Sequence, residues 1–213
     1  MGVSDMYLFT RTRTAHPGHF MTAMTFATEI TATARAVSGV EIHAWISVMS
    51  PSAGDIVWTA WFDTLADWEV ATDKLGADAA YNSAVEKSDG LFTGPVIDQM
   101  ASLLSPLPEG EPDATYVSVV TAVAANGQIG AAVQFGLAMA ETATKLGGLN
   151  TSFAMATTGP YGGVMWFTGA PTIAAMDAAA NAFNSDPAFL QLVDSGGNLF
   201  QNGATQTTYR RIV

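Results

Sequence analysis

The hydrophobic and polar residues of this chain follow two periodicities. Residues 40–49, VEIHAWISVM, alternate at every position, which predicts an extended strand. The apolar side of that strand consists of Ile42, Ala44, Ile46 and Val48. The opposite side consists of Glu41, His43, Trp45, Ser47 and Met49. This second side is either a solvated outer surface or the wall of a cavity in which an acid, an imidazole and an indole meet a ligand.

The same two periodicities predict the other elements of the first half of the chain. Strands are expected at residues 6–14, 40–49, 55–62 and 95–104, and helices at residues 19–37 and from residue 65 onward. Gly39 is expected to end the first helix, and Thr64 to cap the start of the second. The second helix is expected to break near Gly76 and to resume as a short turn.

An internal repeat organises the whole sequence. A shift of 109 residues, reduced to 108 after a one-residue deletion near Ala53, aligns the two halves. The matched pairs include Tyr7 with Tyr116, Gly39 with Gly148 and Trp58 with Trp166. The repeat predicts a tandem duplication with a first unit at residues 1–104, a linker rich in proline and acidic residues at 105–114, and a second unit at 115–213.

Each unit has the predicted order strand, helix, strand, strand, helix, strand. This order is typical of a ferredoxin-like βαββαβ unit, in which both helices cover one face of an antiparallel sheet and leave the other face uncovered. Two such units in one chain can bury their uncovered faces against each other. The expected fold class is therefore α+β, with two tandem ferredoxin-like units packed sheet to sheet as a pseudo-twofold α+β barrel.

Three segments give this pattern a family resemblance: GDIVWTAWFDTLADWE, LGADAAYNSAVEK and FNSDPAFLQLV. With the order of elements, they resemble the dimeric α+β barrel superfamily, which includes antibiotic-biosynthesis-type monooxygenases and NIPSNAP-like proteins. The resemblance implies a small hydrophobic or aromatic ligand in the barrel, and a cofactor-independent monooxygenase as one activity. Some members use an Asn, Trp and His constellation, in some cases with haem. That constellation is not matched here, so no cofactor is predicted.

Candidate catalytic residues come from the strand face that begins with Glu41. If helices cover the apolar side of residues 40–49, then Glu41 and His43 point away from the helices. In the first strand, Leu8, Thr10 and Thr12 are expected to face the helices, which places Arg11 with Glu41 and His43. His43 would act as a general base oriented by Glu41, and Arg11 would stabilise an oxyanion. The expected substrate-binding residues on this face are Tyr7, Phe9, Arg13, Trp45 and Trp61.

The second copy has smaller groups at the same positions. Asn150, Ser152 and Ala154 replace Glu41, His43 and Trp45, and Ser118, Val120 and Ala122 replace Phe9, Arg11 and Arg13. One interpretation is that the first half supplies the functional groups of a ligand cavity and that the small residues of the second half leave space for the ligand. The other is that large side chains fill gaps opposite small ones, as in any packed core. In that case His43 is a hydrogen-bonded interior histidine.

His16 and His19 are the nearest approach to a metal motif, but Pro17-Gly18 separates them at a helix start and no carboxylate completes a zinc triad. Their counterparts in the second copy are Ala125 and Gln128. No metal site is therefore predicted.

The amino-acid composition and net charge limit the kinds of chemistry and partner that are expected. Of 213 residues, 49% are hydrophobic and none is cysteine, which excludes disulfides and cysteine nucleophiles. The net charge of −11 disfavours nucleic acid and anionic membranes as partners. No apolar run approaches the roughly 18 residues of a membrane span, and no signal-like segment begins the sequence, so a cytoplasmic location is expected.

The leading hypothesis is thus an enzyme that acts on a small organic molecule. The alternative is a non-catalytic ligand-binding or assembly protein with a packed interior, in which Phe26 and Phe135 are exposed for association as a homo-oligomer.

Overall fold

The computed structural model describes residues 6–106 and 114–213, so residues 107–113 of the predicted linker lie outside the described residues. The chain divides into two compact units. The N-terminal unit comprises residues 6–100 together with Arg210–Val213, and the C-terminal unit comprises the described part of Ala101–Tyr209. The C-terminal unit therefore includes residues 101–103 from the first half of the sequence, and the N-terminal unit includes Arg210–Val213 from the second half. The predicted units at 1–104 and 115–213 do not include this exchange of chain ends.

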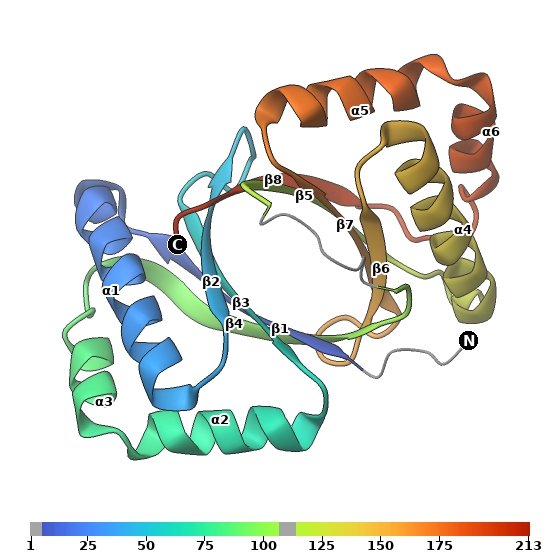
Figure 1. Ribbon diagram of the computed structural model, residues 1–213. Coiled ribbons are helices and arrows are strands. Elements are labelled where there is room, and N and C mark those ends of the chain that lie inside the picture. The colour runs from blue at the N-terminus through green and yellow to red at the C-terminus, as the bar shows by residue number, and fades with distance from the viewer. Residues whose placement is uncertain (1–5, 107–113) are drawn as a thin grey trace. The chain divides into compact units, whose positions relative to one another are not determined.

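Both units have the same order of elements (Figure 1). The N-terminal half contains β1 (Tyr7–Ala15), the short 3-10 helix η1 (Pro17–His19), α1 (Phe20–Ser38), β2 (Ile42–Val48), β3 (Asp55–Phe62), α2 (Leu65–Ala77), α3 (Ala79–Glu86) and β4 (Phe92–Leu103). The C-terminal half contains β5 (Tyr116–Val123), α4 (Ile129–Gly147), β6 (Thr151–Ala156), β7 (Gly163–Ala170), α5 (Ile173–Ser185), α6 (Pro187–Ser195) and β8 (Thr205–Arg211).

Each unit contains an antiparallel sheet. Within the N-terminal unit, β3 pairs antiparallel with both β1 and β2. Within the C-terminal unit, β7 pairs in the same way with β5 and β6. These pairings and the helices on each unit confirm the predicted α+β fold class.

The predicted helix boundaries are confirmed by their caps. Gly39 adopts a left-handed conformation with φ 78° and donates its N–H to the carbonyl of Arg35, which ends α1. Thr64 forms a capping box with Asp67 at the start of α2. The predicted break near Gly76 is also confirmed. It lies at Asp78, whose carboxylate accepts the N–H of Tyr81 at 2.7 Å and begins α3.

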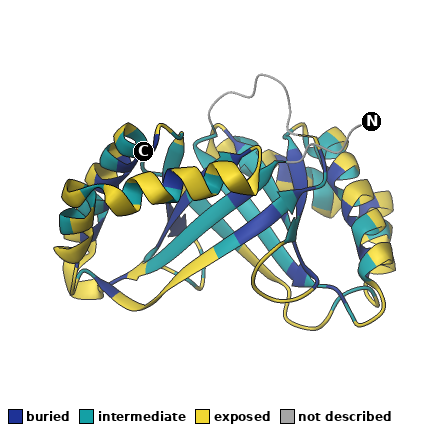
Figure 2. Ribbon diagram, turned by 90° about the horizontal axis from the view of Figure 1, so that it is seen from below, coloured by how far each residue is buried: buried dark blue, intermediate teal, exposed yellow. Residues whose placement is uncertain are grey.

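The core of the N-terminal unit lies between α1 and the strands. Its main members are Ala23, Ala27 and Ile30 from α1, Ala44 and Ile46 from β2, and Ile56 and Trp58 from β3. Trp58 donates its indole N–H to Thr31 Oγ1 at 3.0 Å, which ties β3 to α1. Figure 2 shows the same arrangement as burial, with the sides of the helices that face the strands buried and the outer sides exposed.

The C-terminal unit fills its core with larger rings. Phe153 of β6 is completely buried and lies 5.1 Å from Trp166, measured between ring centroids. Trp166 donates its indole N–H to the carbonyl of Gly136 on α4 at 2.9 Å. The residue that corresponds to Phe153 in the first half is Ala44. The two units therefore share a framework but differ in how completely aromatic side chains fill it.

The predicted exposure of Phe26 and Phe135 is wrong. Phe26 packs edge-on against Phe92, with ring centroids 5.8 Å apart, and Phe135 packs against Trp166 at 6.4 Å. Both rings are partly buried because they cover the apolar cores on the inner sides of α1 and α4.

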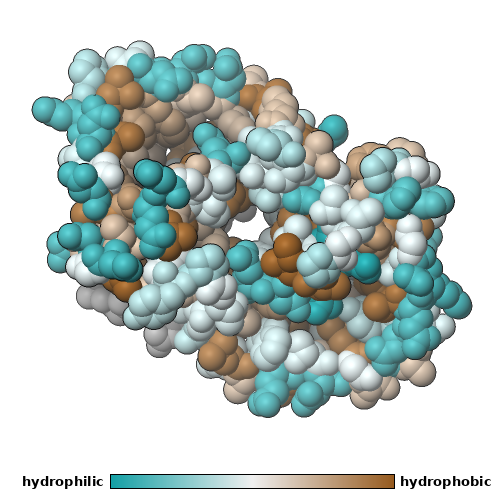
Figure 3. Space-filling view, turned by 180° about the vertical axis from the view of Figure 1, so that it is seen from behind, coloured by the Kyte–Doolittle hydropathy of each residue, from teal (hydrophilic) through white to brown (hydrophobic). Residues whose placement is uncertain are grey.

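Hydrophobic side chains that are exposed occur in patches among hydrophilic ones (Figure 3). None of the helices in the described part of the chain has the length and hydropathy needed to cross a bilayer.

The close packing of Phe153 against α4 predicts opposite effects for two glycine substitutions in that helix. A Cβ at Gly136 would lie 2.2 Å from the Phe153 ring, whereas a Cβ at Gly130 would meet nothing within 4 Å. Gly136→Ala is expected to lower the free energy of unfolding by about 1–3 kcal/mol, the usual cost of overpacking. Gly130→Ala is expected to be neutral or stabilising, because alanine favours the helix. Thermal unfolding followed by circular dichroism measures both, and equal effects would contradict the packing described for Phe153.

Candidate functional site

The register of β1 on β3 decides which side chains lie together. Arg11 is opposite Trp58, Phe9 is opposite Ala60 and Arg13 is opposite Ile56. Directly paired residues on antiparallel strands project to the same face, and Trp58 contacts α1. Phe9, Arg11 and Arg13 therefore face the helices. The prediction that Arg11 shares a face with Glu41 and His43 is wrong, because Leu8, Thr10 and Thr12 occupy the opposite face.

The helix-facing side of the N-terminal unit contains a cavity of about 150 Å³ that is partly open to solvent. Strands β1 and β3 form its floor, and α1, α2 and α3 form its walls. Its aromatic lining consists of Phe9, Phe26, Trp58, Phe62, Trp68 and Tyr81. An apolar cavity of about 150 Å³ accommodates a molecule the size of benzene. The cavity thus has room for a small aromatic compound, and its open side allows for a substituent.

The positive charge of Arg11, which lines this cavity, is paired with a carboxylate. Its guanidinium donates two hydrogen bonds to the carboxylate of Asp98 on β4, at 2.8 and 2.7 Å. This bidentate hydrogen bonding raises the pKa of Arg11 further above its ordinary value. The charge of Arg11 is therefore compensated within the protein. The sequence prediction named Arg11 but missed Asp98, whose proximity depends on the neighbouring positions of β1 and β4.

Arg13, the second cation of the cavity, has no carboxylate hydrogen-bonded to it within the described residues. Its Nη1 donates to Ser88 Oγ at 3.3 Å, and its guanidinium carbon lies 4.1 Å from the centroid of the Phe92 ring. Burial, and secondarily the charge of Arg11, lower the pKa of Arg13 from its ordinary value, and the charge of Asp89 opposes them only in part. In the described part of the chain, Arg13 Nε is buried and has no hydrogen-bond partner. The guanidinium keeps an unused donor beside an apolar space.

Trp68 of α2 provides a second donor of this kind. Its side chain lines the cavity, and its ring centroid lies 6.2 Å from that of Phe9. Within the described residues, Trp68 Nε1 is buried without a hydrogen-bond partner. Buried N–H groups are normally hydrogen-bonded, so two unpaired donors around one cavity are unusual and indicate where a ligand oxygen would be stabilised.

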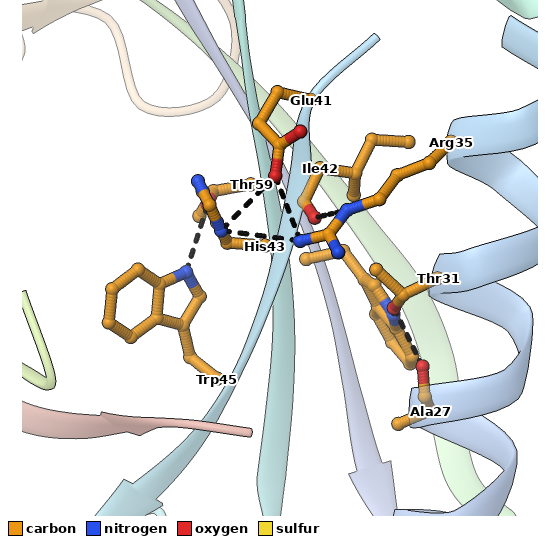
Figure 4. Close-up of polar contacts among 9 residues, drawn as sticks. Ala27, Thr31, Arg35, Glu41, Ile42, His43, Trp45 and Thr59 are labelled. Atoms are coloured by element: carbon orange, nitrogen blue, oxygen red, sulfur yellow. Dashed lines mark hydrogen bonds and ion pairs between the residues drawn. The ribbon is translucent and has the colours of Figure 1, made fainter. Parts of the chain in front are cut away.

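The predicted residues of β2 form a separate cluster on the other side of the sheet (Figure 4). His43 and Trp45 point away from α1, as expected from the alternation of residues 40–49. Glu41 Oε1 lies 3.0 Å from Arg35 Nη2 and 3.9 Å from His43 Nδ1. The Glu41 side chain is 69% exposed, and that of His43 is 23% exposed. The acid and the imidazole are adjacent, as predicted, but Glu41, His43 and Trp45 are not among the residues that line the cavity.

Arg35 is the member of this cluster that the strand pattern did not reveal. It lies in the last turn of α1 and donates from Nε to the carbonyl of Ile42 at 2.7 Å. Its counterpart in the second half, Thr144, accepts the N–H of Thr151 at 2.9 Å. Both contacts tie a helix end to the start of the following strand. Arg35 therefore has a structural role, and its ion pair with Glu41 is largely solvated.

The remaining predicted residues divide between the two faces. Tyr7 is opposite Phe62 and packs in the same hydrophobic cluster as Phe9 and Trp68, on the helix side. Trp61 is opposite Leu8 and so lies on the other face. Trp45, also on that face, donates its indole N–H to Thr59 Oγ1 at 2.9 Å.

The two histidines at the start of the first helix stabilise a turn. His16 Nδ1 accepts the N–H of Gly18 at 3.1 Å and so caps η1, and the rings of His16 and His19 lie 5.2 Å apart.

The C-terminal unit lacks the charges of the cavity. Ser118, Val120 and Ala122 occupy the positions of Phe9, Arg11 and Arg13. Phe183 and Phe189, at the positions of Leu75 and Tyr81, stack with ring centroids 4.8 Å apart. The arginines therefore distinguish the N-terminal unit from its counterpart.

Solved structures of several proteins have the same fold as this chain, at low sequence identity. A proposed monooxygenase from Fusobacterium nucleatum subsp. nucleatum matches with a TM-score of 0.74 at 8% identity, over 99% of this chain and 94% of the other. One from Lactobacillus acidophilus matches with a TM-score of 0.66 at 10% identity, over 98% and 95%. An anthrone oxidase-like protein matches with a TM-score of 0.69 at 11% identity, over 98% and 91%. The chain thus has the α+β fold of monooxygenase-like proteins. No protein-family profile and no curated protein matches the sequence.

The separation of the two faces predicts the behaviour of a His43 variant. His43→Ala removes a ring on the side of the sheet opposite to the cavity, so ligand binding in the cavity is expected to stay within about twofold of the original protein. Binding of toluene, measured by quenching of tryptophan fluorescence, tests this because Trp58 and Trp68 line the cavity. A tenfold loss of affinity in a correctly folded His43→Ala protein would instead place the site on the face of Glu41 and His43.

Proposed function

We propose that this protein binds a small hydrophobic or aromatic molecule in the cavity of its N-terminal unit and oxidises it with O2. The observation that carries the binding proposal is the pair of unpaired buried donors, Arg13 Nε and Trp68 Nε1, around an aromatic-lined cavity. Such a combination of apolar walls and a few polar groups is typical of small-molecule sites. The likeness to proposed monooxygenases and to an anthrone oxidase-like protein supports the oxidation.

The oxidation can be balanced without a separate reductant. When an activated CH2 group is converted to a carbonyl, one atom of O2 enters the substrate, and the other leaves as water with the two hydrogens. The substrate itself supplies the electrons. Loss of its first proton leaves negative charge on a substrate oxygen, and preorganised cationic donors stabilise such charge. Arg11 and Arg13 are the residues that we propose for this role, which keeps the function predicted for Arg11 but moves it to the helix side.

A non-catalytic ligand-binding protein is the second candidate, and the composition of the lining favours it. Among the residues that line the cavity, all of which belong to the described part of the chain, none is a carboxylate or an imidazole. A general base for proton removal would therefore have to be Tyr81, the substrate's own ionised group or a base in solution.

We also infer that the two units arose by tandem duplication. The inference is supported by the matching order of elements and by matching caps, Thr64 with Thr172 and Asp78 with Asp186. A homo-oligomer remains a prediction.

Filling the cavity tests the proposed site. Ala34 of α1 lines the cavity, whereas Ala23 on the same helix is completely buried in the packed core. Ala34→Leu is expected to abolish toluene binding with little loss of stability, because its side chain extends into free space. Ala23→Leu is expected to lower the free energy of unfolding by about 1–3 kcal/mol through overpacking. Titration calorimetry and thermal unfolding measure the two effects. Undiminished toluene binding by Ala34→Leu would show that the ligand binds elsewhere.

The oxidation is tested separately from binding. Native mass spectrometry of the purified protein identifies a co-purified ligand and the oligomeric state together. Oxygen uptake with that ligand, and a product mass increased by 14 Da, is expected for conversion of CH2 to a carbonyl. Tight binding without oxygen uptake would support the non-catalytic alternative.

A further inference from the structure

We propose that the cavity selects an aromatic anion, a ring that carries one carboxylate or ionised hydroxyl group, and that Arg13 binds its acidic oxygens. This inference deepens the proposed function and rests on the cavity being the ligand site. It concerns the charge that the ligand carries when it binds, whereas the proposed function concerns the place of binding and the oxidation that follows.

The charge balance of the cavity is the first reason. Its lining contains two cations, Arg11 and Arg13, and no carboxylate. Asp98, beside the cavity, compensates Arg11 through two hydrogen bonds. Arg13 has only a neutral hydroxyl, Ser88 Oγ, as a hydrogen-bond partner, and that hydroxyl donates its own hydrogen to the carbonyl of Val85 at 2.7 Å. Arg13 is only partly buried, and the nearby Asp89 carboxylate accepts no hydrogen bond from it within the described residues. An acidic group on the ligand would give Arg13 the directly bonded counter-ion that Asp98 gives Arg11.

The position of the free donors is the second reason. Arg13 and Trp68 come from β1 and α2 and line the same cavity. Each has a buried N–H without an acceptor among the described residues. Neither group can accept a hydrogen bond, so the ligand must bring acceptors. A carboxylate or an aromatic oxyanion is acceptor-only when ionised, and hydrogen bonds to charged groups are about twice as strong as neutral ones.

The aromatic lining is the third reason. Phe9, Trp58, Phe62 and Tyr81 surround the donors with ring surfaces. The Phe92 ring already covers one side of the Arg13 guanidinium at 4.1 Å, which keeps water from that side. An aliphatic anion as small as acetate would leave most of this apolar surface unfilled. The combination of a flat apolar body and one acidic oxygen group therefore fits the site better than either part alone.

The C-terminal unit gives an internal control for the stoichiometry. Its residues Val120 and Ala122 have no charge, and Met176, which has no N–H on its side chain, stands at the position of Trp68. The anion should therefore bind once per chain.

The test compares benzoate with benzamide, which has nearly the same shape but no charge, by titration calorimetry at low ionic strength. The original protein is expected to bind benzoate about tenfold or more tightly than benzamide, with one site per chain. Arg13→Gln is expected to remove this preference by weakening the binding of benzoate far more than that of benzamide. Lys87→Gln, which removes an exposed positive charge next to Ser88, is the matched control and is expected to keep the preference.

The outcomes separate the two proposals. Equal affinity for benzoate and benzamide would overturn the selection of anions but would leave the proposed ligand site intact. If neither of these compounds nor toluene binds, both proposals fail. A preference for benzoate that Arg13→Gln retains, or that Lys87→Gln abolishes, would assign the effect to general charge rather than to Arg13. If Arg13→Gln does not fold, the ratio of benzoate to benzamide affinity in the original protein still decides whether the protein selects anions. Whether bound benzoate protects the fluorescence of Trp68 from an added quencher then decides whether it binds in the cavity.

Discussion

The contact of one tryptophan with the helix above it determines the arrangement of the N-terminal unit. Trp58 is fixed by its hydrogen bond to Thr31, so this side of β3 must face α1. The register of the neighbouring strands then decides the direction of every other side chain, because directly paired residues share a face. Arg11 is carried to the helix side, and Thr59 and its neighbour His43 to the other side. Trp166 has the same position in the C-terminal unit, although it donates to a main-chain carbonyl instead.

The two units have the same arrangement of elements but fill the space between helices and sheet with different side chains. Phe153 presses against Gly136 so closely that no Cβ would fit there, and Phe183 and Phe189 stack over the same sheet face. At the corresponding positions the N-terminal unit has Ala44, Leu75 and Tyr81. Leu75 and Tyr81 line the cavity, together with Ala34, Ala60 and Ala71. Ala34 and Ala71 have alanine counterparts, Ala143 and Ala179, so the contrast between the units lies in the aromatic residues and in the first strand.

Electrostatics gives this cavity its chemical character. Two guanidinium groups lie on one strand at positions 11 and 13, and their mutual repulsion and burial would be unfavourable without partners. Asp98 compensates one of them. The other, Arg13, is near Asp89 but hydrogen-bonds only to a hydroxyl group and lies against an aromatic face, so its unused N–H is available to a ligand. The cluster of Arg35, Glu41 and His43 is different in kind, because its charges pair with each other near solvent and connect α1 to β2.

The sequence by itself determined the elements, the repeat and the fold class. Periodicity and caps depend on residues near in sequence, which is why the end of α1 at Gly39 and the start of α2 at Thr64 could be predicted. It also determined the two sides of residues 40–49, because only one side is apolar throughout. For β1 both sides are mixed, and alternation cannot tell which of them meets the helices. That choice, the pairing of Arg11 with Asp98, and the unpaired donors of Arg13 and Trp68 were decided only by the tertiary structure, because each depends on strand register and on contacts between residues far apart in the chain.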